Sequence, residues 1–153
     1  MDKLHENTLD VAESLLNGPS FDGAALRRAV SSAYYSVFQR LSSLCASRLS
    51  GQSFGSEEYR HLYRILDHKR VRSVLNRSDI FKDQLGARFE QLQEVRHWAD
   101  YDIARHPVIA GQDFSTNEAR IYVNKAREAL HIVNSLDDTA QLKLAVLLIV
   151  RER

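Results

Sequence analysis

Residues 96 to 102 read Arg-His-Trp-Ala-Asp-Tyr-Asp, a run dense in groups capable of acid–base and electrostatic chemistry. In a helix, Arg96 and Asp100 lie one turn apart on one face, and so do His97 and Tyr101. Arg96 also continues an inward apolar stripe, so its guanidinium should be partly buried and should need a carboxylate such as that of Asp100. Either these four residues form a catalytic site, or Arg96 and Asp100 form a structural ion pair.

A second run, Ser-Ser-Ala-Tyr-Tyr-Ser-Val-Phe, occupies residues 31 to 38. Its small residues permit close approach of another helix. Tyr35 and Phe38 share a face, whereas Tyr34 is rotated by about 100° from Tyr35. Two interpretations stay open: the rings pack as an aromatic cluster, or Tyr34 and Tyr35 line a dimer cleft with a hydroxyl facing a symmetric partner.

Residues 57 to 77 form a basic segment, with six Lys or Arg against three Asp or Glu. Arg64, His68 and Arg72 are spaced by four, so one continuous helix would present them as a ridge able to contact nucleic-acid phosphates. The alternative is an ordinary solvated helix face, because charges elsewhere compensate.

Other classes of site lack a sequence signature. There is no glycine-rich phosphate loop, nucleophile elbow or His-Glu-x-x-His motif. The six histidines are scattered without metal-ligand pairing, and the single cysteine, Cys45, fits a core position. We therefore expect no metal and no cofactor.

Composition is that of a globular domain. The chain has 153 residues, of which 44% are hydrophobic and 27% charged, enough for one domain with a substantial core. The net charge of +1 gives no global field, so any RNA must bind a local patch. The start lacks the apolar run of a signal peptide, and the longest apolar stretch, 144–150, is too short for a membrane span. These features predict a cytoplasmic protein without membrane association.

Hydrophobic spacing predicts helices throughout. The expected helices cover residues 4–16, 22–49, 57–77, 81–104 and 116–136, while 139–150 is a short helix or an extended arm. Leu4, Val11, Ala12 and Leu15 are expected on the inner face of the first helix, Asp22 at the start of the second, and Ser115 with Glu118 in a capping box. The predicted fold is a single all-α domain over residues 1–153, an up-and-down bundle of four to six helices. Its spine is the antiparallel pair 22–49 and 81–104, and 139–153 packs as a C-terminal arm.

The two motif-bearing helices together resemble the small HEPN proteins of prokaryotic defence and toxin–antitoxin systems. The family pattern is Ala-Tyr-Tyr-x-x-Phe on an early helix, here residues 33–38, followed by Glu-x-Arg-x-x-Ala-Asp-Tyr-Asp, here residues 94–102. The resemblance covers about residues 4 to 136. It implies a HEPN-like bundle that forms a homodimer through the faces bearing these motifs.

For function, the resemblance implies two alternatives. Many HEPN proteins are metal-independent endoribonucleases in which an Arg is followed, after four to six residues, by a His. No histidine here has that spacing, since His97 directly follows Arg96, and Ser32 and Gln39 replace the family's common Arg and His. The first alternative is RNA or nucleotide binding at the dimer cleft, with Arg96 facing phosphate and His97 as the acid–base group in metal-free RNA cleavage. The second is a non-catalytic homodimeric module that partners a nucleotidyltransferase, an antitoxin or another protein.

Overall fold

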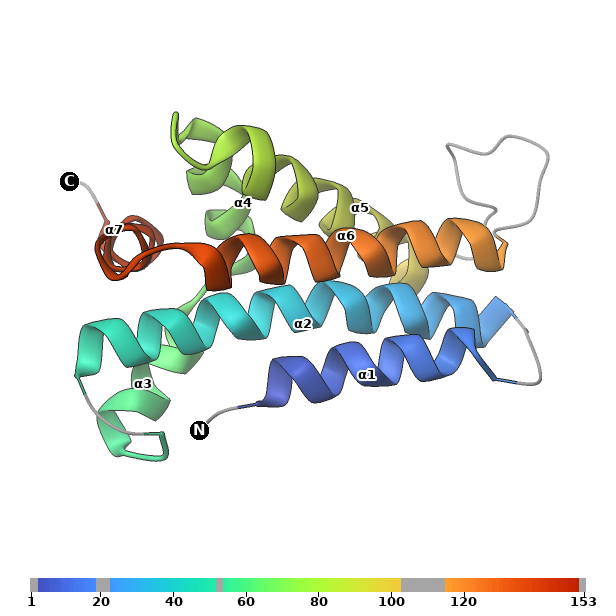
Figure 1. Cartoon of the computed structure of the whole chain (residues 1–153), viewed down its shortest axis with the longest axis horizontal. Helices are drawn as coiled ribbons and strands as arrows, with labels where there is room; N and C mark the ends of the chain where they lie inside the picture. The colour runs from blue at the N-terminus through green and yellow to red at the C-terminus, as the bar shows by residue number, and fades with distance from the viewer. Residues whose placement is uncertain (1–2, 19–22, 52–53, 103–114, 152–153) are drawn as a thin grey trace.

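The computed structural model describes residues 3–18, 23–51, 54–102 and 115–151, and these residues fold into helices without strands (Figure 1). This confirms the predicted all-α class. The long helices are α1 (Leu4–Leu16), α2 (Gly23–Ser50), α5 (Ala87–Tyr101) and α6 (Thr116–Ser135). The shorter ones are α3 (Glu57–Ile65), α4 (His68–Arg77) and α7 (Asp138–Ile149), and a π-helical turn, η1 (Lys82–Gly86), leads into α5.

The four long helices form an up-and-down bundle in which α1 and α5 run one way and α2 and α6 the other (Figure 1). Side-chain contacts agree with these directions. Arg27, near the start of α2, donates to carbonyls at the end of α5, whereas Arg48, near the end of α2, donates to Asp138 at the start of α7. The predicted antiparallel pairing of α2 with α5 is therefore present.

Helix α2 lies at the centre of the molecule rather than on one side of a two-helix spine. It packs against α1, α3, α5, α6 and α7. Side chains on several of its faces are consequently buried, and small residues such as Ala29, Ala33 and Ser36 have no exposed surface. Small side chains allow neighbouring helices to approach α2 closely from more than one direction.

Helix α1 is rotated from the orientation that we expected. Leu4 and Val11 are 48% and 51% exposed, while His5, Leu9 and Leu16 are buried together with Ala12. Leu4 and Val11 lie two helical turns apart on one face, and the buried residues repeat at spacings of three and four on another, so each set defines a helix face and periodicity alone does not choose between them. The small side chain of Ala12, which is completely buried, suits the close packing of α1 on α2.

The basic segment 57–77 is two helices, not one. Leu66 has an extended backbone (φ −62°, ψ 129°), and the next residue, Asp67, caps α4 by accepting hydrogen bonds from the backbone N–H groups of Lys69 and Arg70 at 2.8 and 3.1 Å. A strong cap within the segment starts a new helix, so the segment changes direction there. As a result, α4 packs beside η1, α5 and α7.

The C-terminal segment is helical, which resolves the alternative between helix and extended arm. Asp137 caps the start of α7 by accepting from the N–H of Ala140 at 2.7 Å. At the other end, the guanidinium of Arg70 donates to the carbonyls of Leu148 and Val150. A cation at the C-terminal end of a helix also interacts favourably with the helix dipole.

The predicted capping box of α6 is present, with Ser115 and Glu118 each bonding the other's backbone N–H. The expected cap at Asp22 and the last positions of the expected helix 81–104 lie outside the described residues. No helix within the described ranges has an apolar stretch long enough to cross a bilayer.

Candidate functional site

The side chain of Arg96 lies inside the bundle. Its helix, α5, buries Leu92, Val95 and Ala99 on the same face, and this stripe carries Arg96 inward until only 10% of its side chain is exposed. The expectation of a buried guanidinium is confirmed. Aromatic rings enclose the cation: its central carbon lies 4.9 Å from the ring centre of Tyr34, 5.7 Å from that of Tyr35 and 5.9 Å from that of Tyr101. Such cation–π contacts compensate part of the cost of burying the charge.

Among the described residues, the Arg96 guanidinium interacts with the Tyr34 hydroxyl, and its remaining polar partners are incomplete. Nη1 of Arg96 lies 3.8 Å from Oδ2 of Asp100, which is an electrostatic contact but longer than a hydrogen bond. The Nε atom is buried and has no hydrogen-bond partner in the part of the chain that the structure describes. A buried donor without an acceptor costs free energy, so Arg96 retains capacity for an additional acceptor such as an anion oxygen.

His68 joins this cluster from α4. Its Nδ1 lies 2.5 Å from the hydroxyl of Tyr34, and its ring stacks on that of Phe38 with centres 3.8 Å apart. Spacing along the chain had placed His68 on a basic ridge with Arg64 and Arg72. Tertiary packing instead places His68 beside Tyr34, the tyrosine whose ring contacts the Arg96 guanidinium. No sequence pattern within residues 57–77 predicts this contact.

Burial and the nearby charge of Arg96 set the protonation states in the cluster. Burial, reinforced by the positive charge of Arg96, lowers the pKa of His68 below its usual value, while Asp67 opposes this shift. Burial raises the pKa of Tyr34, and Arg96 counteracts part of the rise. At neutral pH the phenol is therefore protonated and the imidazole is neutral, so the Tyr34 hydroxyl can donate to Nδ1 of His68.

The other residues of the 96–102 motif lie further out. His97 and Tyr101 are exposed, and their rings lie 5.1 Å apart, as expected for residues one turn apart on one face. Tyr101 is 68% exposed yet still reaches the Arg96 guanidinium, so it forms the outer edge of the cluster. His97 faces away from the buried side of α5, because consecutive residues on a helix differ by about 100°. The structure thus separates the predicted acid–base residue from the buried cation.

Arg64, His68 and Arg72 do not form the predicted ridge on one helix face. The break at Leu66 puts Arg64 on α3 and the other two residues on α4. Arg72 is also occupied. Its guanidinium forms ion pairs of 2.5 and 2.9 Å with Glu90 and Glu94 of α5. Its charge therefore serves to hold α4 against α5.

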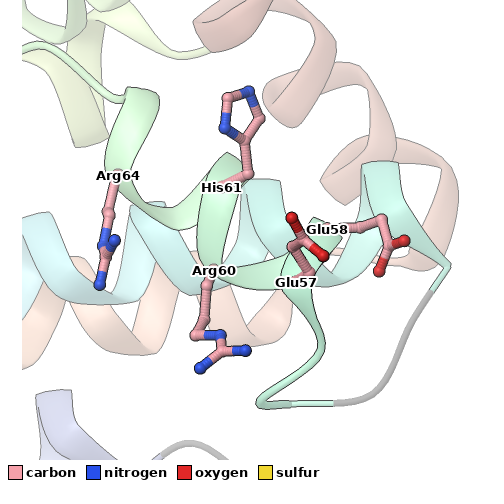
Figure 2. A pocket seen from close by; sticks show the side chains of 5 residues that line it. All are labelled: Glu57, Glu58, Arg60, His61 and Arg64. Atoms are coloured by element: carbon pink, nitrogen blue, oxygen red, sulfur yellow. The ribbon is translucent and has the colours of Figure 1, made fainter.

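Arg64 lines an open depression of about 700 Å³ on α3 together with Glu57, Glu58, Arg60 and His61. Figure 2 shows that these five side chains spread in different directions over the exposed face of the helix and do not converge on one point. Acidic and basic groups are mixed in its lining. The depression therefore has no defined preference for an anion or a cation.

Tyr34 and Tyr35 differ in the surface that they offer. Tyr34 is completely buried and packs edge-on against Tyr35, at 5.3 Å between ring centres, and beside Phe89 at 5.4 Å. It therefore exposes no surface to a symmetric partner, and its hydroxyl is turned to His68. Tyr35 is only partly buried and keeps some exposed surface. The aromatic-cluster interpretation describes the position of Tyr34.

Two further groups bear on chemistry. Burial raises the pKa of the Cys45 thiol to about 12, so Cys45 stays protonated and unreactive in the core. In the described parts of the chain, no group of His, Cys, Asp and Glu side chains is arranged to hold a metal ion.

Comparison with models of known protein families, with curated proteins and with solved structures found no match to this chain.

Proposed function

We propose that this protein is a HEPN-like component of a prokaryotic defence or toxin–antitoxin system that binds RNA or nucleotide phosphate at Arg96. The resemblance of the two helix motifs supports the family. The unsatisfied Nε of Arg96 is the observation that supports the ligand class. A phosphate oxygen is a suitable acceptor for a guanidinium whose own carboxylate stays 3.8 Å away.

The outer edge of the cluster supplies a surface for the rest of a nucleotide. The ring of Tyr101 is 68% exposed and lies 5.9 Å from the Arg96 guanidinium carbon. An exposed aromatic ring beside a cation can stack a base while the cation holds a phosphate. In a catalytic form of this function, RNA bound across Tyr101 would be cleaved without metal, with His97 as the acid–base group because its ring lies 5.1 Å from that of Tyr101, although it is apart from the buried Arg96 guanidinium.

A binding assay with matched arginine variants tests the proposal. A fluorescent oligouridylate is titrated with wild type, Arg96→Met and Arg120→Met, where Arg120 is an exposed arginine of α6. We expect Arg96→Met to weaken binding by about tenfold or more, because it removes a charge-assisted hydrogen-bond donor. Arg120→Met should bind within about twofold of wild type, since one exposed charge on another helix contributes little. Equal binding by Arg96→Met, or no binding by wild type, would contradict the proposal.

Cleavage is tested separately by incubating the protein with total RNA in the presence of a chelator. Products from wild type that disappear with Arg96→Ala would establish the catalytic form. An absence of products alongside Arg96-dependent binding would leave a binding protein.

The burial of Arg96 favours a second candidate, a non-catalytic homodimeric module that partners a nucleotidyltransferase or an antitoxin. A guanidinium that is 10% exposed and lies against rings of α2 also serves to join α2 to α5. In this candidate, Arg96→Met lowers thermal stability without changing RNA binding. Light scattering at micromolar concentration should show a dimer for either candidate, and a monomer would argue against both.

A further inference from the structure

His68 and Arg96 come from different helices, and both contact Tyr34. The Tyr34 hydroxyl is 2.5 Å from Nδ1 of His68, and the Arg96 guanidinium carbon is 4.9 Å from the centre of the same ring. The ring of Tyr35 is also nearly perpendicular to that of His68, with centres 6.1 Å apart, and the Arg96 guanidinium carbon lies 5.7 Å from the centre of the Tyr35 ring. Two groups able to carry positive charge thus contact the same pair of tyrosines.

We infer that His68 is a second member of the anion site and makes its affinity for phosphodiesters increase on acidification. The inference rests on the proposed function, because it needs an anion bound at Arg96. At neutral pH Arg96 supplies the positive charge at this site, with the Asp100 carboxylate 3.8 Å from its guanidinium. A proton on His68 adds a second cation beside it, and a bound phosphodiester offsets the repulsion between the two.

The groups that face the imidazole determine how it titrates. Helix α2 contributes the phenols of Tyr34 and Tyr35, and α5 contributes the guanidinium of Arg96. The carboxylate of Asp67, the residue directly before His68, also acts on the imidazole. Burial and Arg96 keep the pKa of His68 below its usual value, and Asp67 acts against them. The charge change therefore falls on the acidic side of neutrality in the free protein.

Binding linkage gives the matching expectation for the proton. If protonation of His68 strengthens anion binding, then a bound anion must raise the pKa of His68 by the same coupling free energy. A purely structural histidine would show no such response to RNA. This reciprocal shift separates a role in binding from a role in packing.

The test measures oligouridylate binding between about pH 7.5 and pH 5.5, a window in which the phosphodiesters keep their charge. Wild type is compared with His68→Gln and with His131→Gln, in which an exposed histidine of α6 is replaced. We expect wild type and His131→Gln to bind at least about fivefold more tightly at the acidic end, and His68→Gln to lose most of this pH dependence. Far-UV circular dichroism at each pH confirms that every variant stays folded.

NMR titration of the histidine rings of wild type gives a second measurement that does not depend on folding of a variant. The His68 signal, identified by its loss in His68→Gln, should titrate at a higher pH when oligouridylate is bound. Binding that depends on Arg96 but has a flat pH profile in wild type, or an unchanged His68 titration, would overturn this inference and leave the proposed function standing. No binding by wild type at any pH would instead refute the proposed function itself.

Discussion

At the scale of single residues, the main feature is a buried cation surrounded by rings. Arg96 gains cation–π contacts with tyrosines of α2 but receives only a 3.8 Å contact from its carboxylate. His68 lies nearby in its neutral form, bonded to Tyr34. Burial and the charge of Arg96 favour the neutral form of His68, so pH is the natural variable for examining the cluster.

The stability of the fold should decrease as the pH falls below neutrality, in part because of His68. Its pKa is lower in the folded state than the usual value, so the unfolded chain binds the proton more tightly. The stabilisation is present above the unfolded pKa of about 6.5 and is lost as the pH falls through that value towards the folded pKa. Chemical unfolding at several pH values should show this decrease in the free energy of unfolding.

His68→Gln should be less sensitive to acid than wild type over the same range, whereas His131→Gln should follow wild type. An equal acid dependence in wild type and His68→Gln would show that other groups are responsible. The stability measurement is made without RNA, so it is independent of the binding experiment.

At the scale of helices, polar side chains from one helix cap and clamp the ends of another. Arg27 donates to the carbonyls of Trp98 and Ala99 at the end of α5 and lies 4.3 Å from the centre of the Trp98 ring. Arg72 joins α4 to α5 through ion pairs with Glu90 and Glu94. Arg70 joins α4 to the end of α7 by donating hydrogen bonds to the carbonyls of Leu148 and Val150. Arginine contacts therefore add to apolar packing in joining α4 to α5 and α7.

Arg70→Met should destabilise the end of α7 and the contact between α4 and α7. The variant removes donors to the carbonyls of Leu148 and Val150 and a favourable charge at the helix end, at a cost of about 1 to 2 kcal/mol. Hydrogen exchange should become faster in the last turns of α7. Lys69→Met, at an exposed position one residue earlier, is the control and should leave exchange in α7 unchanged. Equal exchange in Arg70→Met and wild type would show that the cap contributes nothing.

At the scale of the whole molecule, the fold depends on the central position of α2. Neighbours on several sides require small residues at its contacts, and Ala33 is completely buried one residue before Tyr34. The position of Tyr34, and through it the placement of Arg96 and His68, therefore follows from how closely the surrounding helices approach α2.

Ala33→Leu should lower the free energy of unfolding by about 2 kcal/mol or more, because the added methylene and methyl groups have no space in a packed interface. The matched control is Ala24→Leu at an exposed position near the start of α2, which should change stability by less than about 0.5 kcal/mol. Urea unfolding measures both variants. Similar stability for Ala33→Leu and wild type would mean that α2 is less tightly enclosed than the structure shows.

Several features follow from the sequence by itself. Spacing of apolar residues predicts α1, α2 and α6 closely, and α5 without the π-helical turn that precedes it, because each long helix needs an inward stripe that repeats every three to four residues. The capping box at Ser115 and Glu118 is a local interaction, so sequence is sufficient to predict it. Burial of Arg96 is also predictable, since it continues the apolar stripe of its helix.

Other features required the tertiary structure. Periodicity could not choose which stripe of α1 faces inward, and it could not show that Asp67 starts a new helix within an otherwise continuous basic pattern. The contact of His68 with Tyr34 joins residues far apart in the chain, and only the packing of α4 creates it. The sequence determines local periodicity and caps because these depend on neighbouring residues. Tertiary structure alone decided that His68 joins Arg96 and Tyr34, because this contact depends on the packing of α4 against the other helices.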